Sequence, residues 1–189
     1  MRTESRFEVL IAGLGGQGVV TIAKLLVEAA AHDYPHAFFF PSYGTEQRGG
    51  WVQCSAALAK TLEDSQPRLH PDAAISFSSG GLAGITQRLG SGGKLFVESS
   101  LCSTGSDDSR STVDSFPGRL YLIPALEKAH ELGSGQVANL IFLGAYLEAT
   151  GALTLEKVEV ALETRMGGGK KASLLELNRR ALRLGASLV

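Results

Sequence analysis

The sequence has few cysteines and no long hydrophobic run. Its two cysteines, Cys54 and Cys102, are too few for the four thiolates of an iron–sulfur cluster, and one disulfide would not define a small secreted scaffold. We therefore expect a reducing, cytoplasmic location. No segment approaches the roughly 20 apolar residues of a membrane span. The first apolar run stops at Gly13, so neither a signal peptide nor a membrane association is predicted.

A surplus of positive charge is also missing. The chain has 18 Lys and Arg against 19 Asp and Glu, so its formal net charge is -1 and we expect no nucleic-acid partner. Its 189 residues are 44% hydrophobic and 20% charged, which is typical of a folded protein. We interpret residues 1–189 as a single domain. The four histidines, which show no metal-ligand spacing and predict no metal site, are His32, His36, His70 and His130.

Glycine, by contrast, is abundant, with 23 residues in the chain. One cluster follows a short apolar run over residues 7–12 and precedes an amphipathic pattern over residues 17–31. This is a GxGxxG pattern in the strand–turn–helix context that lets a phosphate approach a helix N-terminus. The candidate binding residues of the turn are Gly13, Gly15, Gly16, Gln17 and Gly18.

A dinucleotide site needs more than this turn, because an acidic residue at the end of the second strand must hold the ribose hydroxyls. Here the strand predicted over residues 36–40 runs into Pro41 and Ser42, and Asp33 comes before it. We therefore disfavour NAD binding. Two interpretations stay open: a tight structural turn, or a site for an anion or a partner's carbonyl at the backbone amides of residues 15–18.

The remaining sequence alternates short apolar runs with helical patterns. Strands are predicted over residues 51–58, 73–77, 94–98 and 119–123, and helices over 82–89, 125–132, 137–149, 154–164 and 172–184. This order predicts an α/β fold: a three-layer Rossmann-like domain with a mostly parallel sheet, an antiparallel insertion around residues 51–62 and a helical C-terminal third. Pro41 is expected to end its strand, and residues 99–118, rich in Ser and Asp, to form an exposed excursion without chemistry.

A second glycine-rich segment spans residues 41–50, at the carboxyl end of a strand, where open α/β sheets bind ligands and partners. Its candidate active-site side chains are Tyr43, Glu46 and Arg48, and the surrounding loop or interface residues are Pro41, Ser42, Gly44, Gly49 and Gly50. From spacing alone, a solvated pair of Glu46 and Arg48 is the simpler interpretation.

One polar residue lies on the apolar helix predicted over residues 137–149. We expect Asn139 to support the 41–50 loop rather than to catalyse a reaction. Gly144 in the same helix costs about 1 kcal/mol relative to Ala, so we expect close packing against another element there.

The two glycine-rich segments together resemble the gamma subunit of the 2-oxoacid:ferredoxin oxidoreductases, which include the pyruvate, 2-oxoglutarate, ketoisovalerate and indolepyruvate enzymes. The similarity continues to the C-terminus through Ile123-Pro124-Ala125, Glu131-Leu132-Gly133, Ala138-Asn139, Leu143-Gly144-Ala145, Thr150-Gly151, Asn178, Ala181 and Gly185. It covers nearly the whole chain. Two residues depart from the pattern: Trp51 is bulky just after the double glycine, and Ser134 stands where an Asn is common.

The resemblance implies a subunit that binds no cofactor alone and is inactive alone. Alpha and beta subunits, with or without a delta subunit, would hold thiamine diphosphate, Mg and 4Fe–4S clusters. The complex would oxidatively decarboxylate a 2-oxoacid, 2-oxoglutarate or pyruvate-like, with coenzyme A as co-substrate and ferredoxin as electron acceptor. The loop with Tyr43, Glu46 and Arg48 would face the thiamine-binding subunit. The alternatives are an autonomous Rossmann-like NAD(P)-binding dehydrogenase and a nucleotide- or CoA-binding module without chemistry.

Overall fold

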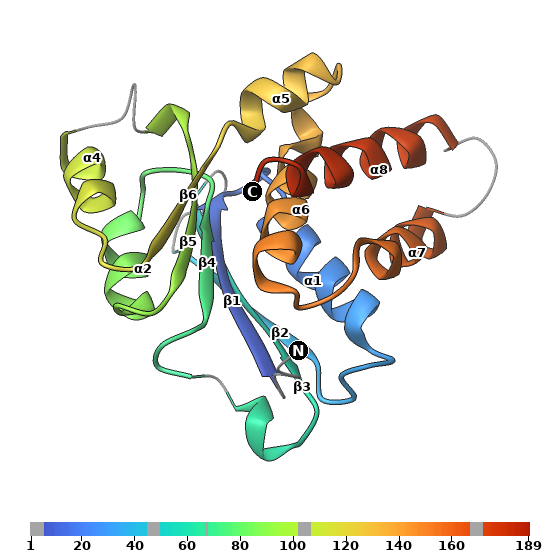
Figure 1. The fold of residues 1–189 in the computed structure, drawn as a ribbon, viewed down its shortest axis with the longest axis horizontal. Helices are drawn as coiled ribbons and strands as arrows, with labels where there is room; N and C mark the ends of the chain where they lie inside the picture. The colour runs from blue at the N-terminus through green and yellow to red at the C-terminus, as the bar shows by residue number, and fades with distance from the viewer. Residues whose placement is uncertain (1–5, 45–49, 67, 102–106, 167–171) are drawn as a thin grey trace.

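The computed structural model describes residues 6–44, 50–66, 68–101, 107–166 and 172–189 (Figure 1). The strands are β1 (Arg6–Leu14), β2 (Phe38–Tyr43), β3 (Trp51–Ala59), β4 (Ala73–Ser76), β5 (Lys94–Glu98) and β6 (Arg119–Ile123). The helices are α1 (Val19–Ala30), α2 (Leu82–Leu89), α4 (Asp107–Asp114), α5 (Ala125–Glu131), α6 (Ala138–Thr150), α7 (Leu155–Met166) and α8 (Ala172–Ala186). Two 3₁₀ turns are η1 (Glu63–Ser65) and η2 (Gly135–Val137).

The strands form one sheet in the order β2-β3-β1-β4-β5-β6. Strands β1, β4, β5 and β6 run parallel, whereas β3 lies antiparallel between β1 and β2. This confirms the mostly parallel sheet with an antiparallel insertion. Residues 6–13 of β1 are buried throughout, because β1 has a neighbouring strand on each side and helices over both faces.

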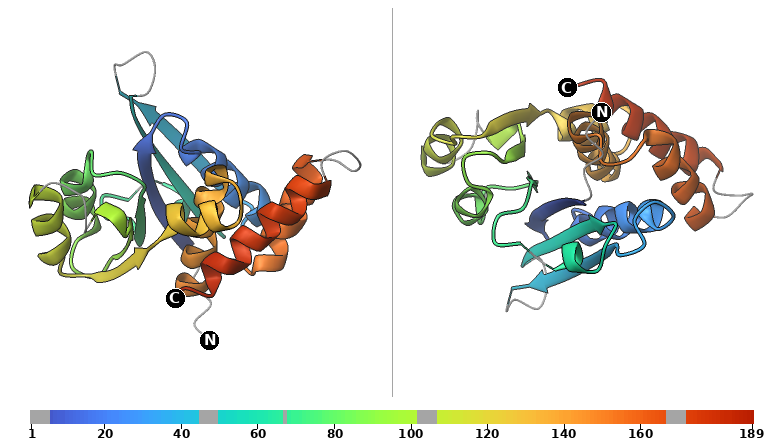
Figure 2. Two further views of the ribbon diagram at one scale, coloured as in Figure 1. Left: turned by 90° about the horizontal axis from the view of Figure 1, so that it is seen from above. Right: turned by 60° about the horizontal axis from the view of Figure 1, so that its bottom comes forward.

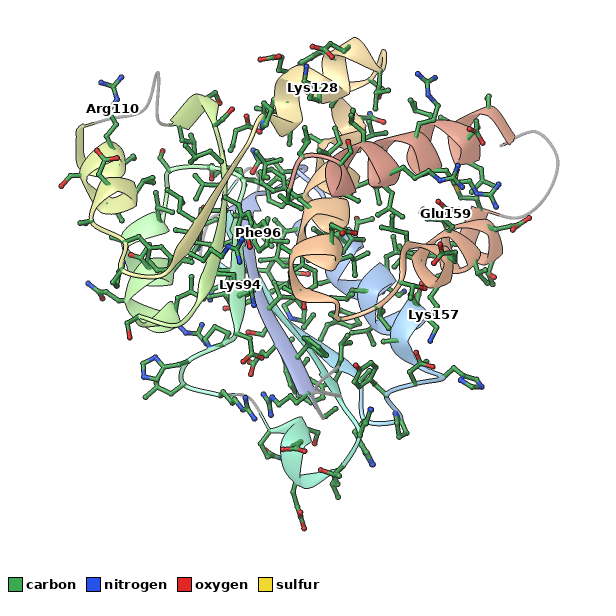
Figure 3. The ribbon with its side chains drawn as sticks, viewed as in Figure 1. Lys94, Phe96, Arg110, Lys128, Lys157 and Glu159 are labelled. Atoms are coloured by element: carbon green, nitrogen blue, oxygen red, sulfur yellow. The ribbon has the colours of Figure 1, made fainter. Side chains whose placement is uncertain are left out.

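Helices α1 and α6 cover one face of the sheet, and α2 and α4 cover the other (Figure 1). On the α6 side, Phe77 of the segment after β4 meets Phe142 with ring centroids 4.8 Å apart. Phe96 of β5 (Figure 3) is stacked on Tyr121 at 4.6 Å and edge-on to Tyr146 at 6.1 Å. Burying an aromatic side chain of this kind stabilises the fold by about 2–3 kcal/mol.

Helices α7 and α8 form an outer layer, because α7 packs on α1 and α8 packs on α6. Lys157 of α7 pairs with Asp33, which follows α1, and Arg183 of α8 places its Nε 2.6 Å from an oxygen of Glu159 (Figure 3). Exposed ion pairs contribute less than about 1 kcal/mol each to stability. The burial of apolar residues therefore holds α7 and α8 against the inner helices.

The crossing of α6 and α8 explains two glycines. A Cβ atom at Gly144 would overlap the carbonyl oxygen of Leu182, and one at Gly185 would overlap the carbonyl oxygen of Ile141. The two helix backbones are therefore in direct contact. The close packing expected at Gly144 is confirmed.

The prediction that Pro41 ends the second strand is wrong, because β2 continues to Tyr43. Strand β2 is the outermost strand, and the N–H groups of His36 and Gly44 donate to carbonyls of Ala59 and Trp51 on the β3 side. Because N–H direction alternates along a strand, the nitrogen of Pro41 faces away from β3. An outer strand tolerates proline in this position since no ladder hydrogen bond is lost.

The prediction of an exposed excursion over residues 99–118 is wrong in one respect, because part of the segment is a helix that packs on the core. Residues 107–114 form α4, and Val113 is buried against the core on the α2 side, with Phe116 packed beside it. Val113 lies within α4 and Phe116 lies after its end, and the many Ser and Asp residues around them obscure both apolar positions in the sequence. Within the described ranges, no helix is long and apolar enough to cross a membrane.

Candidate functional site

The two glycine-rich segments meet at the carboxyl edge of the sheet, where β1 and β2 end and β3 begins. The Gly15 N–H donates to the carbonyl of Gly50 at 3.0 Å, and the Gly44 N–H donates to the carbonyl of Trp51 at 2.8 Å. The paired ends of β2 and β3 extend beyond the helices here (Figure 2). The fold therefore joins the turn after β1 directly to the base of the second glycine-rich segment.

Gln17 and two left-handed glycines shape the turn after β1. Gly16 has φ +97° and Gly18 has φ +84°, conformations that side chains rarely adopt. The Gln17 side-chain oxygen accepts the Leu14 N–H at 2.6 Å, and the Gln17 N–H donates to the Leu14 carbonyl at 3.1 Å. A Cβ at Gly13 would lie 2.5 Å from the same Gln17 oxygen. Gln17 thus closes the turn, and Gly13 leaves room for it.

The N-terminus of α1 opens from this turn without a side-chain cap. Gly18 is the N-cap residue, it makes no side-chain cap hydrogen bond, and the first turn holds no acidic residue. First-turn amides have no partner within the helix, and the helix dipole makes this end positive. A cavity of about 270 Å³ adjoins it, lined by Leu14, Gly15, Gly16, Gly18, Val19, Val20, Thr21, Tyr43 and Val52. The geometry can hold a group that supplies acceptor oxygens.

Tyr43 is the candidate side chain that the structure brings to this cavity. It ends β2 and is 65% exposed, so its phenol is available to a partner or ligand. Glu46, Arg48 and Gly49 lie outside the described residues.

The other candidate loop residues in the described ranges lie on the exposed part of β2 or at the base of the segment. Pro41 and Ser42 are exposed on β2, and Gly44 and Gly50 form the base of the segment.

Asn139 lies against the glycine turn. A Cβ atom at Gly18 would overlap the Asn139 side-chain nitrogen, so the two residues touch across the start of α1. Asn139 is only 9% exposed, and its side chain makes no hydrogen bond to any residue in the described ranges. Its expected support of the 41–50 loop stays a prediction, whereas its contact with Gly18 was not anticipated.

Trp51 packs against the segment that follows β4. A Cβ at Gly80 would lie 3.4 Å from the indole ring, and one at Gly81 would overlap it. Helices α1 and α2 leave β1 and β4 on opposite faces, which makes this the topological switch point where doubly wound sheets bind nucleotides. The indole fills the α2 side of that point. Sequence reasoning noted Trp51 only as a departure from the family pattern, because its contact depends on long-range strand order.

Glu98 is a buried carboxylate at the same edge that sequence reasoning missed. It ends β5, is 2% exposed, and its Oε2 accepts the Leu126 N–H at 3.0 Å at the start of α5. Burial raises the pKa of Glu98, and hydrogen bonds from backbone groups including that of Leu126 oppose the shift. Its position as the last residue of a short apolar strand is the only sequence signal for this capping role.

Metal-binding and thiol chemistry receive no support from the described residues. In these ranges no group of three or more His, Cys, Asp or Glu side chains is placed to hold a metal ion. Cys54 is buried in β3, and burial raises the pKa of its thiol to about 11, which makes it unreactive near neutral pH. Cys102 lies outside the described residues.

Comparison with known proteins gives a consistent family. The family model described as pyruvate ferredoxin/flavodoxin oxidoreductase matches residues 8–188. The 2-oxoglutarate synthase subunit KorC of Methanothermobacter marburgensis is 30% identical over 186 residues, which cover 97% of each chain. The ketoisovalerate oxidoreductase subunit VorA of Methanothermobacter thermautotrophicus is 29% identical over 94% of this chain. The chain spans only 35% of the length of that relative.

The fold agrees with a solved structure. The pyruvate oxidoreductase subunit PORC of Thermotoga maritima superposes with a TM-score of 0.76 at 26% identity, covering 98% of this chain and 97% of that one. The resemblance seen in the glycine-rich segments thus extends along both the sequence and the fold.

Proposed function

Because the chain belongs to the pyruvate ferredoxin/flavodoxin oxidoreductase family, we propose that it is the gamma subunit of a 2-oxoacid:ferredoxin oxidoreductase. The observation that carries this proposal is the match to KorC, which covers 97% of each chain. Residues 1–189 would act as one gamma-type domain in a cytoplasmic complex. The complex would oxidatively decarboxylate 2-oxoglutarate or a pyruvate-like 2-oxoacid, transfer the acyl group to coenzyme A and reduce ferredoxin.

The cofactors would belong to the other subunits. The two cysteines of this chain cannot ligate a 4Fe–4S cluster, which takes four thiolates. As the family resemblance implies, alpha and beta subunits, with or without a delta subunit, would hold the clusters, and thiamine diphosphate with its Mg. This chain would complete the active site by docking against the thiamine-binding subunit.

The carboxyl edge of the sheet is the part of this chain best suited to that docking. The uncapped end of α1 offers backbone donors to an anion or to a partner's carbonyl oxygen. Exposed Leu14 and Tyr43, which line the cavity beside it, add apolar area. Apolar side chains around a few convergent polar groups are characteristic of protein interfaces. Glu46 and Arg48 would contribute charge from the same segment.

Reconstitution tests the subunit assignment. We expect no 2-oxoacid-dependent reduction of ferredoxin by this chain alone, none by the alpha and beta subunits without it, and turnover when they are mixed. Full turnover without this chain would contradict the proposal. Tight binding of NADH by the isolated chain, followed by fluorescence, would instead favour an autonomous dehydrogenase.

Charge removal tests the role of the loop separately. We expect Glu46→Ala and Arg48→Ala to lower turnover of the reconstituted complex about tenfold or more, because a charged hydrogen bond contributes about 1.5–3 kcal/mol. Glu63→Ala is the matched control, an exposed carboxylate in η1. If both loop variants assembled and turned over like the control, the loop would have no part in the site, whereas the subunit assignment would stand.

A further inference from the structure

The outer edge of the sheet at β2 is open to solvent. Strand β2 is the last strand on its side of the sheet, and its residues 40–43 are exposed. The N–H groups of His36 and Gly44 donate toward β3. Because N–H direction alternates along a strand, the backbone groups of Phe39, Pro41 and Tyr43 face outward. A row of unpaired backbone groups is a template on which another strand can pair.

The composition of β2 also favours pairing with another strand. Its residues, Phe-Phe-Phe-Pro-Ser-Tyr, include three consecutive aromatic residues and no charge. Phe38 and Phe40 place their ring centroids 4.9 Å apart, and Phe40 is 54% exposed. Short uncharged segments of high β-propensity are the ones that associate through their edges. By contrast, β6 at the opposite border of the sheet carries the charged Arg119.

Pro41 lies in the middle of this open edge. A second copy of the chain presents the same edge, so two β2 strands can approach antiparallel about a two-fold axis. In the registers that overlap most of β2, Pro41 lies opposite Phe39 or Pro41 of the second copy, as the alternation of outward-facing residues requires. Proline has no N–H to donate to the facing carbonyl, and its ring occupies the space of that donor. Both copies therefore lose a central hydrogen bond.

We propose that the outer edge of β2 is a latent surface for self-association, and that Pro41 prevents a second copy of this chain from pairing there. Proteins commonly protect outer strands with charged residues or with proline, and β2 carries only the proline. Tyr43 ends the same strand, so a β2 that stays unpaired leaves Tyr43 accessible. This role depends on β2 alone and is independent of the proposed subunit function.

Restoring the missing N–H tests the proposal. Pro41→Val and Pro41→Thr each add an outward-facing donor, and threonine does so with a polar side chain of the same shape. Sedimentation equilibrium of the full chain measures self-association. We expect both variants to associate at least tenfold more strongly than the parent, because each pair of copies gains two hydrogen bonds and loses the obstruction by the rings. Hydrogen exchange should show the amides of Phe39 and Tyr43 protected in the associated form.

Ser42→Val is the matched control. It adds the same apolar side chain at the next position of β2, where the N–H faces β3, and it should sediment like the parent chain. A single urea transition for each variant ensures that only folded chains are compared. Parent-like sedimentation of both Pro41 variants would overturn the proposal. Equal association by Ser42→Val and Pro41→Val would also overturn it, because exposed apolar area and not the open edge would then drive association.

Discussion

The crossing of α6 and α8 and the turn between β1 and α1 both depend on glycine, for different reasons. At the crossing, Gly144 and Gly185 admit the carbonyl oxygens of the facing helix, and neither has a positive φ. At the turn, Gly16 has φ +97° and open space around the position of a Cβ. Packing requires glycine in the first region and backbone conformation requires it in the second. The crossing is therefore expected to determine stability and the turn to determine recognition.

Gly144→Ala should have the largest effect. The added Cβ overlaps backbone, which cannot rotate away, so we expect a loss of about 3 kcal/mol in the free energy of unfolding. The melting temperature of a protein of this size should fall by about 6–12 °C. Urea denaturation measures the change. Gly84→Ala in α2 is the control, because open space surrounds it and alanine there should add about 0.5–1 kcal/mol. Similar outcomes for both variants would refute the packing explanation.

Gly18→Ala should have an intermediate effect on stability, because both steric overlap and backbone strain act at this position. Gly18 has φ +84°, and its added Cβ would overlap the Asn139 side-chain nitrogen. We expect a loss of about 2 kcal/mol in the free energy of unfolding. In an Asn139→Ala background the same substitution should lose only the part due to backbone strain, about 1 kcal/mol. A double-mutant cycle measures the coupling, and a coupling near zero would argue against contact between the two residues.

Gly16→Ala should cost only the backbone strain, about 1 kcal/mol of unfolding free energy. Its effect on assembly should be larger, because the added methyl group lies in the turn that leads into the uncapped end of α1, where backbone donors are open to a partner. Sedimentation of the variant with the alpha and beta subunits measures assembly. Assembly equal to that of the parent chain would show that the turn is not part of the interface.

Substitution of Glu98 should have the smallest effect on stability. Glu98 caps the start of α5 with its side chain, whereas the start of α1 has no side-chain cap. Burial raises the pKa of Glu98, so its stabilising contribution is present at low pH and is lost as pH rises through the folded-state pKa. Glu98→Gln keeps an acceptor oxygen and cannot ionise. Relative to the parent, this variant should therefore gain stability between about pH 4.5, the ordinary value, and pH 8.

Urea denaturation at these two pH values measures that difference for Glu98→Gln. Glu63→Gln, an exposed carboxylate in η1, is the control and should show no such trend. A parent chain that became more stable than Glu98→Gln as pH rose would show that hydrogen bonding outweighs burial at this carboxylate.

The parts that the sequence predicted well are those governed by local pattern. The buried run of β1, the helix after it and the close packing at Gly144 all follow from apolar spacing or from the low helix propensity of glycine. The glycine turn was located correctly because its residues are contiguous.

The parts that the sequence missed depend on neighbours distant in the chain. The effect of Pro41 depends on which side of an outer strand its nitrogen faces, and the place of Trp51 depends on β3 lying beside β1. Asn139 touches Gly18 only because α6 returns to the start of α1. Composition also misled the prediction for residues 107–114, where Val113 packs on the core despite its polar neighbours.

The most direct test of the central claim compares stability and turnover in one variant, Gly16→Ala. The central claim is that the turn serves recognition by the partner subunits rather than the stability of the fold. Turnover of the reconstituted complex should therefore fall more than tenfold while the free energy of unfolding of the chain changes by about 1 kcal/mol. Turnover that stays at the parent level, or that falls only as the folded fraction falls, would contradict the account.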